Sequence, residues 1–362
     1  MDSAIRYADH IGLWDQELAV FVPDKIFDVH VHIGLPDIHS EISEERKKMA
    51  LTTFTSLPAD EYAKWNSSLY PGKEIIGSCV FGFPIRETDI GKANQYVTVQ
   101  SAKNNGLYPF LLISPKDPAV TISQYYEAKS KRIRIYGLKP YFDFVDKKGP
   151  FAVFDVRMEE FLTDEILRFA EKEKLIIMLH TSGIGVGDYV VRDFISRITE
   201  KYTNIKIILA HMGRYCEKSQ FVDFYRSDFL DKHINSNIYY DISSVSEKEV
   251  YKLIFEKEYL HDKVMFGADL PFGLITGVEI FSKTHGPIFL TRDTYAWTDT
   301  RLAEEFKNEA ENLTYNVYHC IKALKDGLEE LNLSEKENRK LVNKIFLKNA
   351  LAMFAEQIRI RC

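Results

Sequence analysis

The chain has 362 residues, of which 45% are hydrophobic and 28% charged, and it carries a formal net charge of −6 with a pI near 6.0. The composition is that of a globular protein, and the acidic balance argues against nucleic acid or an anionic membrane as a partner, since both select for clustered Lys and Arg. Four scattered cysteines, no signal-peptide pattern and no run of roughly 20 apolar residues predict a soluble protein in the reducing cytoplasm.

Eight short apolar runs predict β-strands at residues 26–32, 74–81, 107–114, 132–139, 175–180, 205–211, 237–243 and 263–269. Several runs are apolar throughout, as in strands that are covered on both faces, and helical patterns separate most of them. One helix is expected over 163–174 behind a capping Thr163, and another over 188–202 with an apolar stripe. The alternation predicts an α/β protein with a closed (β/α)8 TIM barrel.

Three segments exceed what a minimal barrel needs, namely residues 1–24, 35–73 after the first strand and 270–298 after the eighth. Loops that follow strands lie over the active face of this fold, so the last two are expected to wall or cover a pocket. C-terminal helices are expected over 300–333 and 334–357, and no linker divides the chain. We expect a single domain over 1–362, with the barrel core at about 25–355.

Polar side chains interrupt the first strand near its carboxyl end. In KIFDVHVHIG, alternation places Asp28, His30 and His32 on one face, with Phe27 and Val29 on the other. The outward face of a barrel strand meets helices and must be apolar, so the histidines are expected to face the barrel axis. Two imidazoles on one face can bind one ion.

His180, His211 and Asp269 close the fifth, sixth and eighth predicted strands in the same way. The carboxyl ends of barrel strands form one ring, so these residues and the H-x-H pair are expected to converge. Imidazole nitrogens with one carboxylate suit zinc or a similar divalent transition ion better than calcium or magnesium. The alternative, five unrelated buried polar residues, requires each to find its own partner in a crowded interior.

Taken in order, the segments FDVHVH, LHTSG, AHMGR, FGADLPFG and FLKNALAMF resemble the amidohydrolase superfamily, most closely its amidohydrolase-related branch of metal-dependent hydrolases and decarboxylases. The resemblance implies four metal ligands: His30, His32, His180 and Asp269. It also implies that His211 is the catalytic acid or base, with Asp269 sharing the proton transfer. Arg214 in AHMGR departs from the commoner glycine-rich ending, so the substrate is expected to differ there.

Lys139 bears on the number of metal ions, because it ends the fourth predicted strand on the inferred inward face. In other branches of the superfamily a lysine at this strand end is carbamylated and bridges two ions, which would assign His180 and His211 to the second ion. The branch that this sequence resembles favours one ion. An unmodified Lys139 could bind a substrate carboxylate, as could Tyr141 and Arg214, or it could pair with a pocket acid such as Asp143.

Three other polar residues each have two interpretations. Asp28 is expected either to orient a histidine or to satisfy backbone groups deep in the barrel. Asp241 and Ser243, at the end of the seventh predicted strand, either line the pocket or form a turn.

The leading functional prediction is a metal-dependent hydrolase that acts on a small carbonyl substrate, an amide, lactone or ester. Water bound to a divalent ion has its pKa lowered toward about 7, and a neutral His211 suits the transfer of its proton. The alternative is a non-oxidative decarboxylase acting on a small carboxylated substrate. A non-catalytic binding barrel is disfavoured because all five chemical residues are present. Zinc is the expected cofactor. A homodimer is the expected oligomer, because homodimers are the commonest assemblies of soluble proteins.

Overall fold

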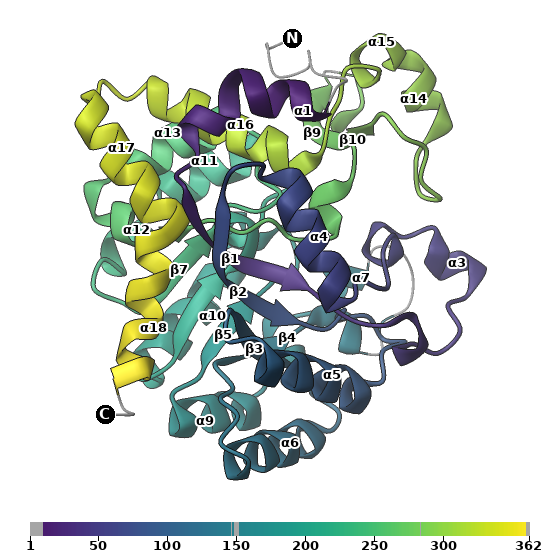
Figure 1. The fold of residues 1–362 in the computed structure, drawn as a ribbon, viewed down its shortest axis with the longest axis vertical. Helices are drawn as coiled ribbons and strands as arrows, with labels where there is room; N and C mark the ends of the chain where they lie inside the picture. The colour runs from purple at the N-terminus through teal and green to yellow at the C-terminus, as the bar shows by residue number, and fades with distance from the viewer. Residues whose placement is uncertain (1–9, 146, 148–151, 283, 360–362) are drawn as a thin grey trace.

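The computed structural model describes residues 10–145, 147, 152–282 and 284–359, and its main sheet has eight strands in the order β1 to β8 (Figure 1). All neighbouring strands in this sheet are parallel. Beyond β8 the chain returns to β1, where the Val29 amide donates to the Phe266 carbonyl (2.9 Å) and the His32 amide to the Leu270 carbonyl (2.7 Å). The predicted (β/α)8 barrel is confirmed.

The strands are β1 (Lys25–His32), β2 (Glu74–Phe81), β3 (Leu107–Ile113), β4 (Gly137–Pro140), β5 (Ile176–Leu179), β6 (Lys206–Leu209), β7 (Ile238–Asp241) and β8 (Val264–Met265). Each overlaps its predicted run, but the prediction that the fourth strand begins at residue 132 is wrong. Arg132 has a left-handed backbone (φ 60°), and the Ile133 amide bonds to the Ala128 carbonyl (2.9 Å). These residues therefore form the end of the preceding helix.

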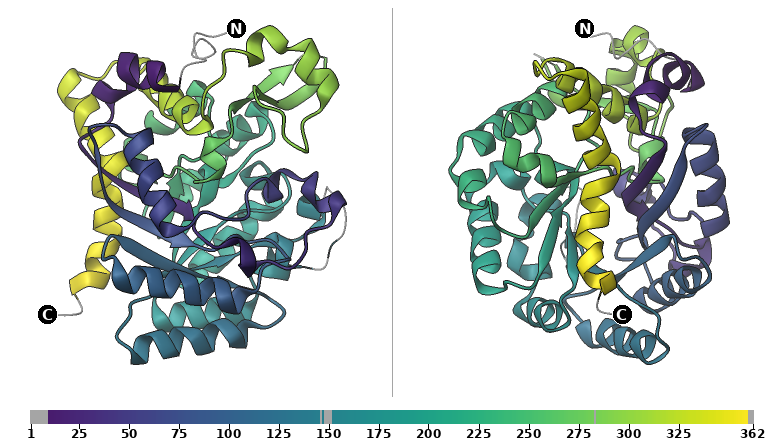
Figure 2. Two further views of the ribbon diagram at one scale, coloured as in Figure 1. Left: turned by 45° about the vertical axis from the view of Figure 1, so that its right-hand side comes forward. Right: turned by 60° about the vertical axis from the view of Figure 1, so that its left-hand side comes forward.

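The longer helices around the barrel are α4 (Ala59–Leu69), α5 (Ile90–Lys103), α6 (Pro118–Ser130), α9 (Asp164–Glu173), α10 (Tyr189–Lys201), α11 (Lys218–Arg226) and α13 (Lys248–Phe255). As predicted, the Thr163 side chain caps α9 by accepting from the Ile166 amide. Helices α16 (Asn316–Glu329), α17 (Glu335–Asn343) and α18 (Asn349–Arg359) follow at the C-terminus. Helix α18 lies across the amino-terminal end of the barrel, where Phe354 packs on Phe27 and Tyr108 (Figure 2).

Shorter helices lie at the N-terminus and in the loops: α1 (His10–Leu13), α2 (Ala19–Phe21), α3 (Glu44–Lys47), α7 (Ala152–Asp155), α8 (Met158–Phe161), α12 (Phe229–Lys232), α14 (Thr300–Glu305) and α15 (Lys307–Ala310). Within the part of the chain that the structure describes, no helix is long and apolar enough to cross a membrane.

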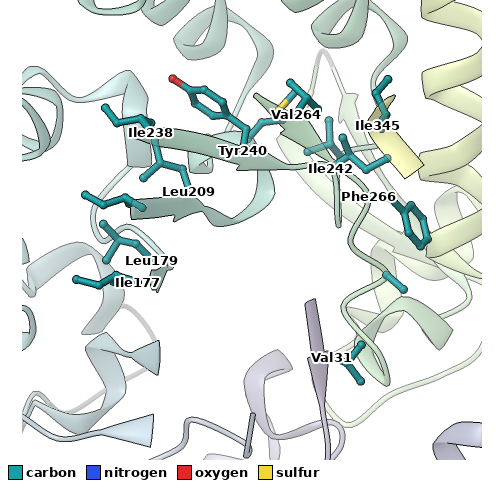
Figure 3. Packing of buried hydrophobic residues seen from close by; sticks show 14 of the residues in the cluster. Val31, Ile177, Leu179, Leu209, Ile238, Tyr240, Ile242, Val264, Phe266 and Ile345 are labelled. Carbon is teal, nitrogen blue, oxygen red and sulfur yellow. The ribbon is translucent and has the colours of Figure 1, made fainter. Parts of the chain in front are cut away.

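Two apolar layers hold the barrel together. Alternate strand residues such as Phe110, Met178 and Ile208 pack inside it with Phe27 and Val29. Their neighbours in the strands belong to a second cluster with the surrounding helices, part of which is shown in Figure 3. Burial on both faces explains the continuous apolar runs of the sequence.

Strand β1 contains a shift of register that the sequence does not reveal. Asp28 pairs with Ser78 of β2 and Val31 pairs with Val80, so three steps on β1 match two on β2. Such a β-bulge reverses the alternation of side chains. The prediction that Phe27 and Val29 share an outward face is therefore wrong, since both pack inside the barrel below the bulge, whereas His30 and His32 face the pocket above it.

The two long insertions stand over the carboxyl ends of the strands. The segment after β1 carries α3 and α4, and the segment after β8 forms an antiparallel hairpin, β9 (Gly277–Ser282) and β10 (Gly286–Thr291), which is followed by α14 and α15. The Trp297 indole donates a hydrogen bond to Thr53 Oγ1 (2.6 Å) and so links the two insertions. This agrees with their predicted place as pocket walls.

Gly137→Ala is expected to destabilise the barrel. A Cβ atom at Gly137 would lie 2.3 Å from both the Ile176 carbonyl oxygen and the Phe110 ring, inside the closely packed barrel. Overpacking of this kind costs about 1–3 kcal/mol, which urea unfolding would measure. Gly91→Ala in α5, where the nearest atom is a side-chain oxygen at 3.3 Å, is the matched control and should lose no stability. Equal stability of the two variants would contradict the packing argument.

Candidate metal centre

A cavity of about 220 Å³ lies at the carboxyl ends of the barrel strands. Its polar floor contains His30, His32, Lys139, Tyr141, His180, His211 and Asp269. Its apolar walls include Leu51 from the first insertion, Ile85 after β2, and Phe272, Ile275 and Phe289 from the last. The cavity therefore joins a strongly polar base to a hydrophobic upper part, as expected of a site for a small organic molecule.

His30, His32 and Asp269 form the tightest group in this cavity. Asp269 Oδ1 lies 3.4 Å from His30 Nε2 and 3.2 Å from His32 Nε2. The other ring nitrogens are already used, because His30 Nδ1 donates to Asp241 Oδ2 (2.9 Å) and His32 Nδ1 donates to the Gly82 carbonyl (3.1 Å). These partners can only accept, so each neutral imidazole presents an unprotonated Nε2 to Asp269.

No proton lies between the Nε2 atoms of His30 and His32 and the carboxylate of Asp269. Burial lowers the pKa of His30 well below its usual range, helped by the charge of Lys139, and burial also lowers the pKa of His32. Burial raises the pKa of Asp269, and only positive charge and donated hydrogen bonds beside it lower the pKa to about 2, so a carboxylate between two neutral imidazoles needs a cation. Three electron-pair donors thus converge, and a cation satisfies all of them. The donor set fits a divalent transition ion.

His180 lies at the edge of this group. Its Nδ1 donates to the carbonyl of Thr181 (2.9 Å), and burial lowers its pKa well below the usual range, so its Nε2 is also unprotonated. Its ring centroid is 5.3 Å from that of His211. The tight cluster of ligand atoms within 4.8 Å of one another contains His30, His32 and Asp269, whereas His180 lines the same cavity outside that cluster.

His211 reaches the pocket through an unusual backbone. The inward-facing residues of this strand are Ile208 and Ala210, so regular alternation would turn residue 211 outward. A left-handed conformation (φ 56°) redirects the side chain, whose ring stacks on that of His30 at 5.1 Å. Its Nδ1 donates to Ser243 Oγ (2.9 Å), which leaves Nε2 for chemistry in the cavity.

Asp241 accepts hydrogen bonds from both His30 and His211. Its Oδ2 accepts from His30 Nδ1, and its Oδ1 accepts from the amides of His211 (3.1 Å) and Ser243 (3.0 Å) and from the Ser243 hydroxyl. The sequence left the roles of Asp241 and Ser243 open between lining the pocket and forming a turn. The structure shows the turn, and neither residue is among those that line the cavity. The position of Asp241 two residues after inward-facing Tyr239 was the available signal for its contact with His30.

Asp28 satisfies backbone groups, which is the second of its two predicted roles. Its Oδ1 accepts from the backbone amides of His30 and Ala268, each at 3.0 Å, and burial raises its pKa to about 8. It therefore satisfies backbone groups where β1 meets the chain after β8, and it does not hydrogen-bond to a histidine ring among the described contacts.

Lys139 points into the base of the cavity. Its Nζ lies 3.4 Å from His30 Nε2 and 4.8 Å from the centre of the Phe81 ring. Burial lowers its pKa to about 8, so the ammonium form still dominates at pH 7. Asp143, the acid considered as its partner, instead binds Arg46 and Arg86. In the described residues Lys139 forms no ion pair with a carboxylate.

The other two residues expected near the substrate differ in position. Tyr141 lines the cavity, with its ring 5.0 Å from that of His180. Arg214 is not among the residues that line it. Its guanidinium donates to the Gly183 carbonyl and lies over the Phe154 ring at 5.5 Å. The structure thus places Arg214 behind the rim of the cavity.

Comparison with known proteins identifies the fold. No protein-family model and no curated protein matches the chain. Among solved structures, dihydroxybenzoic acid decarboxylase from a Polaromonas species, with bound manganese, has a TM-score of 0.54 and 15% identity over 92% of this chain and 98% of that one. 2,6-Dihydroxybenzoate decarboxylase from Rhizobium has a TM-score of 0.52 and 16% identity over 92% and 100%.

A third similar structure is 5-carboxyvanillate decarboxylase from Sphingomonas paucimobilis, with a TM-score of 0.53 and 11% identity over 92% of this chain and 99% of that one. At these identities the similarity shows the fold. That fold is the eight-stranded TIM barrel that was predicted from the sequence.

Asp241→Asn is expected to weaken metal binding about 10- to 100-fold without unfolding the barrel. The amide oxygen would accept less strongly from His30 Nδ1, and loss of a carboxylate that orients a ligating histidine has an effect of this size. Competition with a fluorescent chelator measures the affinity. Asp37→Asn, at an exposed carboxylate in the first insertion, is the control. Unchanged affinity in Asp241→Asn would refute the role of this contact.

Proposed function

We propose that the protein is a metal-dependent enzyme of the amidohydrolase superfamily that removes carbon dioxide from a small carboxylated substrate. One observation carries this proposal: the cation-binding group of His30, His32 and Asp269 shares its cavity with the buried ammonium of Lys139. Together they make a site for an anionic carbonyl compound.

Lys139 favours a carboxylated substrate over a neutral one. A buried ammonium is stabilised by a nearby anion, and this one has no carboxylate ion pair among the described residues. A substrate carboxylate at this position would supply the charge in a charge-assisted hydrogen bond. The apolar walls of Leu51, Phe272 and Phe289 suit an unsaturated or aromatic remainder of the molecule.

The residues of the chain divide the reaction between them. His30, His32 and Asp269 would hold the ion, with His180 as the next candidate ligand, and the ion would polarise a bound oxygen atom and stabilise developing negative charge. Lys139 would position the carboxylate. When the bond between carbon and carboxylate breaks, the electron pair stays on carbon and carbon dioxide leaves. His211, fixed through Nδ1 and carrying a second proton taken up at Nε2 from solvent, would deliver that proton to the carbon.

A hydrolase remains the second candidate, and one contact favours it. His211 stacks on His30, so its free Nε2 is close to the region where a water molecule would be activated. In that reaction His211 would accept a proton from water and return it to the leaving group of an ester, lactone or amide. The three similar structures named above are decarboxylases, which supports the first candidate.

We infer one ion for each chain. A second possible group, His30, His211 and Asp241, shares His30 with the first, and both Asp241 oxygens already accept hydrogen bonds. Zinc suits the donor set, and manganese, the ion bound by the Polaromonas enzyme, is the second choice. We also propose that the substrate is a small molecule, that the protein is cytoplasmic and that it forms a homodimer.

Product analysis tests the reaction. The protein is loaded with zinc or manganese and incubated with a panel of small aromatic and unsaturated carboxylic acids, and separately with esters, lactones and amides. We expect release of carbon dioxide, and a decrease of about 100- to 10,000-fold in His211→Asn with metal content retained. Hydrolysis without carbon dioxide would establish the second candidate. Equal activity in His211→Asn would contradict both mechanisms.

Lys139→Met is expected to lower kcat/KM for the carboxylated substrate by about 10- to 100-fold, since a hydrogen bond to a charged group contributes about 1.5–3 kcal/mol. Metal content should stay at one ion for each chain. Lys92→Met, on an exposed lysine of α5, is the control. A decrease from two ions to one in Lys139→Met would instead show a carbamylated lysine bridging two metals, and would contradict the role of Lys139 as an unmodified anchor for the substrate carboxylate.

A further inference from the structure

Phe289 separates two cavities. It lies on β10 of the last insertion, and its side chain lines the cavity that holds the candidate metal ligands. It also lines a second cavity of about 200 Å³. Phe289 is the only described residue common to both linings.

The second cavity is built largely from apolar side chains. Ile288, Leu290, Trp297 and Leu302 contribute to its lining, and its polar members are two threonines and Asp299. It contains none of the residues assigned to catalysis or metal binding. An apolar space of this size suits a hydrocarbon substituent of a few carbon atoms.

Aromatic neighbours hold the Phe289 ring in place. Trp297 meets it edge to face at 6.1 Å, and Tyr295 stacks on Trp297 at 5.3 Å with an angle of 8° between the rings. Trp297 is tied to Thr53 by its indole N–H, and the Tyr295 hydroxyl accepts from the Thr276 amide (3.0 Å). The ring is therefore supported on the side away from the metal centre and acts as a wall.

We propose that Phe289 is a specificity-determining residue that limits the length of the substrate. The proposal rests on the proposed function, in which the carboxylate binds at the strand ends beside Lys139. Lys139 belongs to β4 and Phe289 to the insertion that covers the strand ends, so the apolar part of an anchored substrate extends toward Phe289. Removal of the ring joins the two cavities and admits a longer apolar substituent.

The experiment compares ligands that differ only in length. Benzoate and its 4-n-alkyl derivatives up to n-butyl are titrated calorimetrically into the metal-loaded full chain and into Phe289→Ala. Burial of each methylene raises affinity about threefold to fourfold. We expect the ratio of affinities for 4-n-butylbenzoate and benzoate to be at least about tenfold higher in Phe289→Ala than in the unchanged protein. Phe289 is 37% exposed, so the variant should fold, which thermal unfolding checks.

Leu302→Ala is the matched control, because Leu302 lines only the second cavity and its loss leaves the wall intact. It should keep the chain-length profile of the unchanged protein. Uncharged n-alkylbenzenes are titrated in parallel. The n-alkylbenzenes could show the increased affinity ratio in Phe289→Ala while the benzoates bind to neither protein. That result would support the role of Phe289 in limiting ligand length and contradict the carboxylate site of the proposed function. The same profile for Phe289→Ala and the unchanged protein in both series, or an equal shift in Leu302→Ala, overturns the proposal.

Discussion

The meeting of three electron-pair donors at the mouth of the barrel is the constraint from which the rest of the site follows. His30 and His32 each donate Nδ1–H to a fixed acceptor, so both Nε2 atoms face the Asp269 carboxylate without a proton between them. Such an arrangement is repulsive in the low dielectric of the interior unless positive charge balances it. The Lys139 ammonium, 3.4 Å from His30 Nε2, supplies part of that charge, and a metal ion would satisfy all three donors. The acceptors behind the rings, Asp241 and the Gly82 carbonyl, therefore determine the chemistry of the centre as much as the ligands do.

Irregular backbone is concentrated around this centre. Five non-glycine residues at the mouth have left-handed φ angles: His211, Met212, Arg214, Ser244 and Asp269. A conformation of this kind costs of order 1–3 kcal/mol for each residue and persists only where the surroundings over-determine it. The closed barrel supplies that support. The bulge in β1 has a similar effect, because it keeps Val29 in the apolar interior while it turns His30 toward the pocket.

Much of the barrel could be predicted from the sequence, because strands buried on both faces leave continuous apolar runs and the chemical residues follow their carboxyl ends. The orientation of individual side chains could not. Alternation assigned His30 and His32 to the inward face correctly but wrongly turned Phe27 and Val29 outward, since a bulge depends on register with β2. Alternation would turn His211 outward, and only its backbone angle corrects this. Contacts such as that between Asp241 and His30 join residues 211 positions apart, so their chemistry appears only in the folded chain.

The architecture separates the polar base of the cavity from its apolar walls. The polar groups come from the strand ends, where hydrogen bonds within the barrel fix their positions, whereas the apolar walls come largely from insertions held together by side-chain contacts such as that of Trp297 with Thr53. The two parts can therefore change independently, since the apolar walls and the group of His30, His32 and Asp269 come largely from different segments. This separation is a physical reason why a barrel only 11–16% identical to those of known decarboxylases can retain the same fold.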